Sequence, residues 1–596
     1  MKNLFQKKYI FCFFLLFLFS CSKGIEEKEP NNTFLEAQLV SLPFTIQGKM
    51  NHGLDEDFYA FEVSIAQIYS FEVKSLKGFD LMMQILDSQG KVLKTADDYF
   101  KNFGESIPNI YLKPGKYFLK IATGINDYKI GRPVVVSSNH YTLKGGPFSN
   151  FCDRPVIYPE HEPNDNFEMA QEIFKGQKIE GYFYPFLNYQ SQNPVLEKVL
   201  EAIKEKTYKD FFGRDLDLYY FSIQEKGEFL LKIELGACQD FDSILSVVSE
   251  NYLNYLSLSP EAQSQVLPEN RGEFFIIDSN GFDKGEGLAN YKIKGNQKYY
   301  ILLTAINRLN YESLENILQN PYTLNFEISP VTADLEAEPN DSFTTAQKIE
   351  TNVLKGFLNP LDDKDFYVLE NSLDSFYKLD FREDNINPHI TRFSKLAKLT
   401  LTPPINLDLA LEIYDDKYQL LKTIDNQGKG EIEVIPNLLL ELNQRIFLVV
   451  RGGKTNDEDN YHEPYELKIY FNDTETQKIE AEINDEAFKN QRENTFTDSI
   501  LGYINTQGDI DNYYLLVENR GRVQFLLKGL PHASFLLELY DANGFFVKKA
   551  VGKLGENVVL DYFAPKREVF RIKVLVIEKD FFNTQDPYEL SFSVSN

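Results

Sequence analysis

The chain has 596 residues and is acidic, because its 89 aspartates and glutamates outnumber its 62 lysines and arginines and give a formal net charge of −27 at pH 7. This charge argues against a nucleic-acid partner, since phosphate groups require a basic surface. It is compatible with an extracytoplasmic surface and with cations as partners. A chain of this length is too long for one core and predicts about four domains.

The N-terminal residues 1–20 have the pattern of a bacterial signal peptide. Lys2, Lys7 and Lys8 form a basic region, and residues 9–19 are an apolar run of eleven, too short to span a membrane as a mature helix. The sequence Leu-Phe-Ser-Cys at 18–21 resembles the bacterial lipobox. The resemblance implies cleavage before Cys21 and lipid on that cysteine, with 21–24 as a tether. The alternative is an ordinary secretory signal followed by an incidental cysteine.

We therefore expect an exported protein that is lipid-anchored to a bacterial membrane, at the outer membrane or the cell surface. No later stretch of the sequence is long and apolar enough to be a transmembrane helix. Two further cysteines, Cys152 and Cys238, lie in one block of the chain. An oxidising compartment permits a disulfide between them, but the sequence does not show whether they are close, so two separate thiols are the alternative.

After the signal, the chain repeats one pattern in four blocks at about 25–149, 150–331, 332–473 and 474–596. An acidic phrase heads each block: Glu-Lys-Glu-Pro-Asn-Asn at 27–32, Glu-His-Glu-Pro-Asn-Asp at 160–165, Glu-Ala-Glu-Pro-Asn-Asp at 336–341 and Glu-Ala-Glu-Ile-Asn-Asp at 480–485. A glycine follows near the start of a short strand (Gly48, Gly181, Gly356, Gly502). This recurrence implies one architecture built four times.

An Asp-x-Asp pair that runs into aromatic residues completes the pattern. Its first aspartate lies 26, 53, 25 and 27 residues after the second glutamate of the phrase in blocks one to four. Each block then ends on a strand that contains Tyr-x-Leu, beginning at Tyr141, Tyr322, Tyr465 and Tyr588. Period-two alternation, 35 tyrosines, 49 phenylalanines and closely spaced turn residues predict an all-β fold of four tandem β-sandwiches.

Block two is the largest because it carries two insertions. In the first, Leu196, Val199, Leu200 and Ile203 fall at helical spacing and predict a small amphipathic helix. The second covers about 250–290. Inserted surface segments often carry binding specificity, but they are also where sequence drift is tolerated.

The acidic phrase and the Asp-x-Asp pair together offer the ligands that calcium prefers, which are six to eight carboxylate, amide and backbone oxygens. In an extended segment, alternate side chains share one side, so the two glutamates and the asparagine face one direction. Many close carboxylates repel one another unless a cation lies among them. The predicted metal ligands are Glu27, Glu29, Asn31, Asn32, Asp55, Asp57, Glu160, Glu162, Asn164, Asp165, Asp215, Asp217, Glu336, Glu338, Asn340, Asp341, Asp363, Asp365, Glu480, Glu482, Asn484, Asp485, Asp509 and Asp511.

The alternative for these residues is structural, since Asn and Asp also cap turns and precede strands. Four coupled copies favour metal in at least one block, with calcium preferred over magnesium because the ligands are many and flexible. Block one has Asn32 where the others have Asp, so we expect a weaker site there. Block four has Ile483 in place of the proline, which affects geometry but removes no ligand.

The combined motifs resemble the bacterial pre-peptidase C-terminal domain family and its relatives, the collagen-binding domains of clostridial collagenases. The resemblance covers essentially the whole mature chain as four copies. It implies a jelly-roll-like β-sandwich that accompanies secreted peptidases without catalysing a reaction itself. It also implies calcium at the phrase and at the second aspartate of each pair (Asp57, Asp217, Asp365, Asp511). This chain has proline where the collagen-binding relatives have asparagine, and collagen binding is not supported.

Catalytic motifs are missing from the sequence. None of its six histidines forms His-Glu-x-x-His, there is no Gly-x-Ser-x-Gly, and residues 451–455 lack the upstream glycine of a phosphate loop. We therefore expect a non-enzymatic, lipid-anchored binding or scaffolding protein with calcium-stiffened repeats, an adhesin for a protein or glycan ligand. Two alternatives are an accessory subunit of a secreted peptidase and a hydrolase whose site lies in the block-two insertions.

Overall fold

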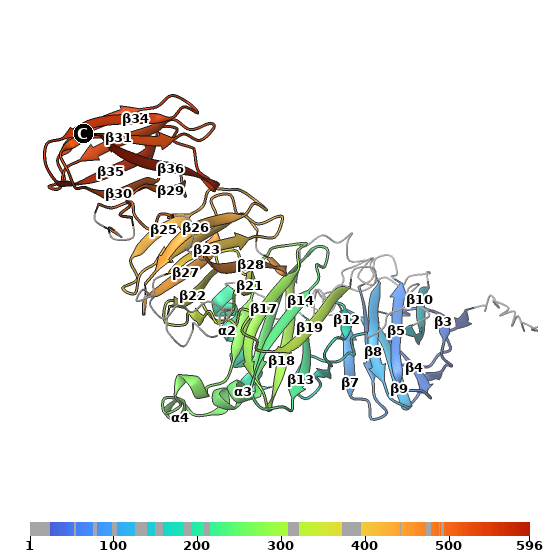
Figure 1. Ribbon diagram of the computed structural model, residues 1–596. Coiled ribbons are helices and arrows are strands. Elements are labelled where there is room, and N and C mark those ends of the chain that lie inside the picture. Colours follow the sequence, from blue (N-terminus) through green and yellow to red (C-terminus); the bar gives the residue numbers. More distant parts are fainter. Residues whose placement is uncertain are drawn as a thin grey trace, which may run out of the picture. The chain divides into compact units, whose positions relative to one another are not determined.

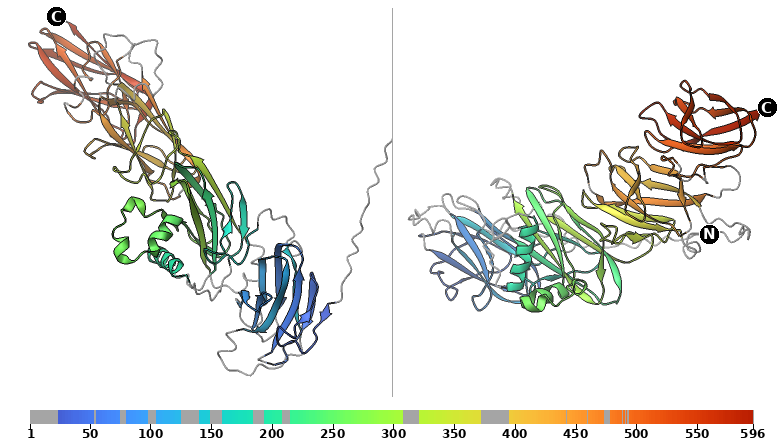
Figure 2. Two further views of the ribbon diagram at one scale, coloured as in Figure 1. Left: turned by 90° about the horizontal axis from the view of Figure 1, so that it is seen from below. Right: turned by 90° about the vertical axis from the view of Figure 1, so that its left-hand side faces the viewer.

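The computed structural model describes residues 24–52, 55–74, 80–97, 104–124, 140–148, 159–183, 193–207, 215–307, 321–371, 395–441, 443–458, 460–472, 478–487, 489, 491 and 494–595. The signal peptide, Cys21 and Cys152 lie outside these residues. Within them the strands form eight sheets, which pair into four two-layered sandwiches (Figures 1 and 2). The predicted all-β fold of tandem sandwiches is confirmed.

Two five-stranded sheets form the first sandwich. The first sheet has the order β1 (Ile25–Glu26), β3 (Phe44–Gly48), β10 (Tyr141–Pro147), β5 (Gln67–Lys74) and β8 (Glu105–Leu112). The second has β2 (Gln38–Leu39), β4 (Glu56–Val63), β9 (Gly115–Thr123), β6 (Leu81–Leu86) and β7 (Val92–Ala96). Alternate residues of these strands, such as Phe44 and Ile46, fill the space between the layers.

The second sandwich repeats this order. One sheet has β11 (Gln171–Glu172), β13 (Leu216–Ile223), β18 (Gln297–Asn307), β15 (Phe241–Ser249) and β16 (Phe274–Ile277), and the other has β12 (Lys178–Gly181), β19 (Tyr322–Pro330), β14 (Glu228–Leu235) and β17 (Glu286–Lys294).

Both predicted insertions of the second block contain helix. The first holds α2 (Pro194–Thr207), in which the four residues predicted from their spacing are all buried. The second holds α3 (Glu250–Ser257), α4 (Pro260–Gln263) and the 3-10 helix η2 (Pro268–Asn270). In the part of the chain that the structure describes, no helix is long and apolar enough to cross a membrane.

In the third sandwich one sheet has β20 (Gln347–Lys348), β22 (Lys364–Glu370), β27 (Arg445–Gly452), β24 (Leu409–Tyr414) and β25 (Leu420–Ile424). The other has β21 (Val353–Leu358), β28 (Asn460–Asn472), β23 (Lys395–Thr402) and β26 (Glu433–Leu440).

The fourth sandwich has two four-stranded sheets. Their orders are β29 (Ser499–Ile504), β36 (Asn583–Ser595), β31 (Gly521–Lys528) and β34 (Val558–Ala564), and β30 (Ile510–Val517), β35 (Glu568–Val576), β32 (Phe535–Tyr540) and β33 (Phe546–Val551). Its large buried side chains form one core cluster, as in the third sandwich.

Contacts divide the chain into two compact units. One comprises residues 1–171, 179–218 and 304–322, and the other comprises 172–178, 219–303 and 323–596. The strands of each sheet pair fall within one predicted block. The exact block boundaries stay predictions, because 149–150 and 473–474 lie outside the described residues.

Candidate metal centres

The acidic phrases run as extended segments that pair with two strands at once. Through parallel bridges, the second, third and fourth segments pair with β12, β21 and β29 of their own sandwiches, at Pro159–Glu180, Leu335–Lys355 and Ile479–Leu501. Each also pairs with the last edge strand of the preceding sandwich, at Ile110–Glu162, Tyr291–Glu338 and Leu438–Glu482. Backbone hydrogen bonds of the acidic segment therefore connect consecutive sandwiches.

The hydrogen bonds around Glu162 show this arrangement. Its N–H donates to the carbonyl of Asn109 at 3.2 Å, and its own carbonyl accepts from the N–H of Tyr111 at 2.9 Å. The equivalent bonds of Glu338 involve Asn290 and Lys292 at 3.1 and 2.8 Å. With both edges of the segment occupied, its side chains are held at fixed places between the two sandwiches.

Each segment brings predicted ligands into what we call the inner cluster: both glutamates of the phrase and the second aspartate of the pair. In the first three blocks these carboxylates each offer an oxygen within 4.8 Å of the others, namely Glu27, Glu29 and Asp57; Glu160, Glu162 and Asp217; and Glu336, Glu338 and Asp365. In the fourth block Glu480 and Glu482 interact electrostatically with Asp511. The four second aspartates are completely buried.

A second set, which we call the outer cluster, shares the second glutamate and adds the last residue of the phrase and the first aspartate of the pair. Glu162, Asp165 and Asp215, and likewise Glu338, Asp341 and Asp363, offer oxygens within 4.8 Å of one another. The equivalent residues are Glu482, Asp485 and Asp509 in block four, and Glu29, Asn32 and Asp55 in block one. The structure thus brings the predicted ligands of the second and third blocks together as two adjoining clusters, and in the fourth block Asp509 interacts electrostatically with Glu482 and Asp485.

Hydrogen bonds from its N–H groups hold the asparagine of the acidic phrase in position. In the second segment Asn164 Nδ2 donates to Glu160 Oε1 at 2.9 Å, and its N–H donates to Glu162 Oε2 at 3.2 Å. In the described structure this leaves Asn164 Oδ1 and Asp217 Oδ1 buried without a hydrogen-bond partner, and the same holds for the Oδ1 atoms of Asn31, Asp57, Asn484 and Asp511. A buried acceptor without a partner costs about 1–3 kcal/mol, so this recurrence needs an explanation.

The closing tyrosine and the recurring glycine belong to the same site. Tyr322 Oη donates to Asp217 Oδ2 at 2.7 Å. A Cβ on Gly181 would lie 2.3 Å from the ring of Tyr322 and 2.9 Å from Glu160 Oε2. Only glycine leaves room for the tyrosine and the glutamate there. The sequence pattern marked both residues as features of the repeat but did not assign them to the metal site.

Burial and mutual repulsion raise the pKa of these carboxyls. Burial and the Glu27 carboxyl raise the pKa of Asp57 to about 9. Burial raises the pKa of Glu162 to about 8, although the Lys94 ammonium opposes the rise. Burial and the Asp365 carboxylate also raise the pKa of Glu336 well above its usual value. The orphaned oxygens and the all-oxygen donor set fit a hard cation such as calcium.

Two lysines that the sequence analysis missed enter outer clusters. Lys94 on β7 is 4% exposed, and its Nζ lies 2.8 Å from Glu162 Oε1 and 3.7 Å from both Asp165 Oδ1 and Asp215 Oδ1. Lys422 on β25 contacts Asp485 Oδ2 at 3.0 Å and also Asp509. The missed signal is a lysine on the inward side of an alternating strand, in Leu-Lys-Thr at 93–95 and 421–423.

The first site is more open than the others. Glu29 and Asn32 are exposed, whereas Glu160 and Glu162 are completely buried. Among the described residues, β1 pairs with β3 of its own sandwich, and no bridge to a second sandwich is formed by this segment. In the fourth segment Ile483 takes the place of the proline, and its side chain lies at 5% exposure in the core of the third sandwich.

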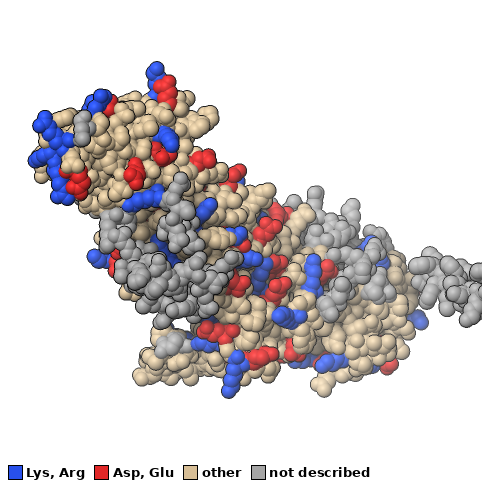
Figure 3. All heavy atoms as spheres, viewed as in Figure 1, with Lys and Arg blue, Asp and Glu red and all other residues tan. Residues whose placement is uncertain are grey.

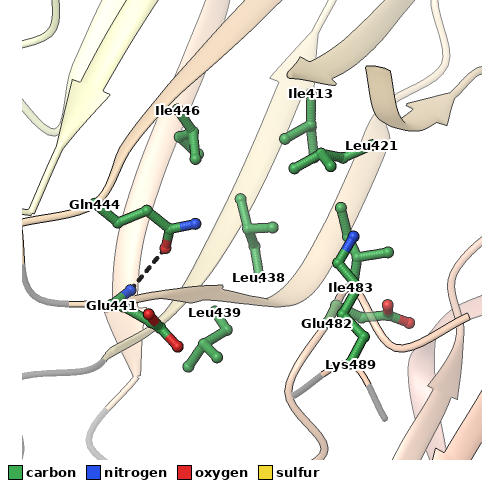
Figure 4. A pocket seen from close by; sticks show the side chains of 10 residues that line it. All are labelled: Ile413, Leu421, Leu438, Leu439, Glu441, Gln444, Ile446, Glu482, Ile483 and Lys489. Atoms are coloured by element: carbon green, nitrogen blue, oxygen red, sulfur yellow. Dashed lines mark hydrogen bonds between the residues drawn. The ribbon is translucent and has the colours of Figure 1, made fainter. Parts of the chain in front are cut away.

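Ile483 also lines a partly open hollow of about 170 Å³ at this junction. Figure 4 shows Ile483 beside Leu438, with Glu482 adjacent. The ten lining residues are Ile413, Leu421, Leu438, Leu439, Glu441, Gln444, Ile446, Glu482, Ile483 and Lys489, and most of them are apolar. The surface is mixed, as the described lysines, arginines and carboxylates are interspersed on the face seen in Figure 3.

A further acidic motif was not anticipated. Asp408, Asp425 and Glu433 stand at one end of the third sandwich, and we call them the acidic triad. The strand registers place Asp80, Asp97 and Glu105 at the same positions in the first sandwich, and Asp242, Asp278 and Glu286 in the second. The fourth sandwich has Ser534, Val551 and Val558 there. Only a block-by-block alignment of these strands reveals the motif.

Cys238 is buried, and its predicted disulfide with Cys152 is untested.

No protein-family model and no curated protein matches the chain. Among solved structures, the pre-peptidase C-terminal domain of collagenase from Bacillus anthracis is 21% identical over 20% of this chain and 99% of its own, with a TM-score of 0.16. A putative secreted protein from Eubacterium rectale is 10% identical over 51% of this chain and 84% of its own, with a TM-score of 0.14. The N-terminal CBM22 tandem domain of Xyn10C from Paenibacillus barcinonensis is 8% identical over 34% of this chain and 79% of its own, with a TM-score of 0.12. TM-scores this low carry no argument, so the assignments above depend on the contacts of this chain.

Proposed function

We propose that this chain is an exported, lipid-anchored, non-catalytic binding protein whose β-sandwiches are ordered by calcium at their acidic segments. The observation that carries the proposal is the repeated pair of buried, unpartnered Oδ1 atoms of the asparagine and the second aspartate in three inner clusters. A calcium ion takes six to eight oxygen ligands at 2.3–2.6 Å, and each inner cluster offers carboxylate and amide oxygens of this kind.

The residues that would hold the ion are those of the inner clusters. In the third block these are Glu336, Glu338 and Asp365, with Asn340 beside them and Tyr465 holding the second oxygen of Asp365. The ion would supply positive charge to a set of buried carboxyls that otherwise take up protons. Since the second, third and fourth segments each join two sandwiches, their ordering would fix the links between consecutive sandwiches.

Thermal unfolding of the exported chain in EDTA and in millimolar calcium tests the proposal. A ligand that binds only the native state stabilises it by about 2.7 kcal/mol at a hundredfold excess over its Kd, so the unfolding midpoint should rise in calcium. Asp365→Asn should reduce this rise and remove bound calcium in titration calorimetry. Asp416→Asn is the matched control, because Asp416 is exposed in the same sandwich. Equal midpoints in EDTA and calcium would refute the proposal.

The binding role is supported by exposed aromatic side chains on the fourth sandwich. Phe545, Phe546 and Phe563 are 69%, 54% and 51% exposed. Large exposed apolar side chains are typical of contact surfaces for protein or glycan partners. Replacing all three with serine should abolish the retention of the chain on a glycan or matrix-protein array, while its unfolding midpoint in calcium should not fall. Unchanged retention would remove this face from the proposal.

A further inference from the structure

The acidic triad brings together strand ends from both layers of the third sandwich. Asp408 directly precedes β24, and Asp425 directly follows β25, the strand that pairs with β24. Glu433 begins β26, which belongs to the other sheet. The N–H groups of Asn426 and Gln427 donate to Glu433 Oε1 at 2.7 and 2.6 Å. The carboxylate of Glu433 therefore lies against the turn that follows Asp425.

A glycine keeps space free beside these acids. Gly453 donates its N–H to the carbonyl of Asp408 at 2.8 Å, and Gly124 of the first sandwich donates equivalently to Asp80 at 2.9 Å. A Cβ on Gly453 would lie 2.6 Å from Asp408 Cγ and closer still to Oδ1. A Cβ on Gly124 would lie 2.6 Å from Asp97 Oδ1 and 3.0 Å from Asp80 Oδ2. The two aspartates at these positions thus face one small space, which only glycine leaves open.

One oxygen of each acid in the third sandwich has no partner. Asp408 is 1% exposed, Glu433 is 2% exposed and the side chain of Asp425 is 7% exposed. In the described structure Asp408 Oδ1, Asp425 Oδ1 and Glu433 Oε2 are buried and accept no hydrogen bond. The second oxygen of Asp408 accepts from the N–H and the hydroxyl of Thr455 at 2.7 and 2.6 Å, so the carboxylate is held in place. Buried acceptors without partners are destabilising, and three at one place indicate a ligand that the protein does not itself supply.

Two lysines lie at the rim of the triad and leave these oxygens unsatisfied. Lys454 Nζ lies 3.9 Å from the other oxygen of Asp425, Oδ2, and its side chain is 69% exposed. Lys429 contacts an exposed aspartate outside the triad. Solvent screens exposed charges of this kind, so they compensate a buried carboxylate weakly. Burial raises the pKa of Glu433, and the charges of Asp425 and Asp408 add to the rise. The three carboxyl groups therefore act on one another more than on a buried cation of the protein.

The three acids occur as a set in the repeats of this chain. In the second sandwich the N–H groups of Ser279 and Asn280 donate to the Glu286 carboxylate at 3.0 and 2.9 Å, as Asn426 and Gln427 do to Glu433. Ligands of one ion are expected to be kept or lost together, because each has little use without the others. The strand registers show the full set in three sandwiches and neutral residues at all three positions in the fourth, where they are Ser534, Val551 and Val558.

We propose that the acidic triad of the third sandwich binds a divalent cation that prefers oxygen ligands, calcium or magnesium. Asp408 Oδ1, Asp425 Oδ1 and Glu433 Oε2 are its protein ligands, and water completes the coordination shell. None of these residues belongs to an acidic phrase or to an Asp-x-Asp pair, so the site is separate from the acidic segments. The ion joins the two sheets of the sandwich at this end. It also steadies the turn in which Asn426 Nδ2 donates to the carbonyl of Asn505 in the fourth sandwich at 2.9 Å.

Metal analysis after equilibrium dialysis of the exported chain tests this site, in millimolar calcium and separately in millimolar magnesium. Glu433→Gln should lower the number of bound ions by one in the metal that the site prefers. Glu431→Gln is the matched control, because Glu431 is exposed and lies two residues away. Gly453→Ala should remove the same ion without removing a carboxylate, since its Cβ fills the space beside Asp408. Gly428→Ala, where a Cβ meets nothing within 4 Å, should leave the number unchanged.

Amide hydrogen exchange of residues 425–433 separates an ion from a shared proton. With the ion bound, Glu433→Gln should speed exchange in this segment at least tenfold relative to the parent chain. In EDTA the substitution should not speed exchange, because the amide relieves the repulsion among the carboxylates. If Glu433→Gln slows exchange in both conditions, the three acids share protons and the assignment is overturned. Circular dichroism of each variant is compared with that of the parent chain, and Glu433→Gln keeps the volume of the side chain.

Asp365→Asn distinguishes this site from the acidic segments. The ion lost in Glu433→Gln should also be lost when the substitution is made in a chain that carries Asp365→Asn. If Glu433→Gln lowers the number of bound ions and Asp365→Asn does not, the triad binds its ion and the proposed function fails. If Asp365→Asn lowers the number but neither Glu433→Gln nor Gly453→Ala does so in either metal, the proposed function stands and the inference about the triad is overturned.

Discussion

Tyr465 and Asp365 are joined across the third sandwich by a buried hydrogen bond of 2.6 Å from the phenol oxygen to Oδ2. The same bond joins Tyr141 to Asp57 at 2.7 Å in the first sandwich, and equivalent bonds occur in the other two. The tyrosine thus comes from the last strand of each sandwich and holds the aspartate that follows the acidic segment. This bond connects the end of each repeat to its beginning.

Tyr465→Phe should therefore destabilise the chain and weaken calcium uptake. The substitution removes the donor and leaves a buried carboxylate oxygen without a partner, which costs about 1–3 kcal/mol. Urea unfolding in EDTA and in calcium, read by tyrosine fluorescence, measures the change. Tyr470→Phe is the matched control, because Tyr470 lies on the same strand and is 47% exposed. If Tyr465→Phe behaved like this control, the bond would have no energetic role.

Gly356→Ala should damage the same site by sterics. The added Cβ would lie 2.2 Å from Glu336 Oε2 and 2.5 Å from Tyr465 Oη, so both groups must shift. Overpacking of this kind costs about 1–3 kcal/mol, and displacing Glu336 should also lower calcium affinity. Gly428→Ala, where the Cβ meets open space, should leave both the unfolding free energy and the calcium isotherm unchanged. An undamaged Gly356→Ala protein would show that the close packing around this glycine is not required.

Stability without metal should fall as the pH rises. Burial raises the folded-state pKa of Asp57 to about 9 and those of Glu162 and Asp509 to about 8, so the folded chain holds protons that the unfolded chain has released. The contribution of these carboxyls to the free energy of unfolding is therefore complete at a pH below the pKa of an ordinary carboxyl group. It is lost as the pH rises toward 8–9. In EDTA the unfolding midpoint should be higher at pH 5 than at pH 8.

Calcium should reverse this trend, because the metal replaces the protons and binds the ionised carboxylates. The calcium-induced rise in midpoint should accordingly be larger at pH 8 than at pH 5. Asp57→Asn should flatten the profile measured in EDTA. A midpoint that rises from pH 5 to pH 8 in EDTA would contradict the burial of these carboxyls as protonated groups.

Much of the fold and part of the site follow from local pattern. Alternation in strands such as Glu568–Val576 predicts a half-buried sheet surface, and the spacing of Leu196 and Ile203 predicts α2. The predicted ligands converge because the extended phrase presents Glu160, Glu162 and Asn164 on one side, as period-two geometry requires. These inferences need only neighbouring residues of the chain.

The rest depends on contacts between distant strands, which no local pattern encodes. In the sequence, Lys94 is an ordinary strand lysine. Only the fold brings it into contact with Glu162, which lies 68 residues further along the chain. The acidic triad is similar, because Asp408 and Glu433 come from different sheets of the third sandwich. Repetition could have revealed both, since each recurs in more than one block, but only after the strand registers are known.

Ile483→Ala should loosen the link between the third and fourth sandwiches. Ile483 belongs to the acidic segment of the fourth block, yet its side chain is 5% exposed and packs in the core of the third. Truncating a buried isoleucine to alanine costs about 2–5 kcal/mol. Ile432→Ala, at a residue 45% exposed, is the control and should change stability by less than about 0.5 kcal/mol. If Ile483 connects the two cores, its truncation should also split urea unfolding into separate transitions for the two sandwiches. A uniform shift of one transition would instead mean that the backbone pairing of Leu438 with Glu482 suffices to couple them.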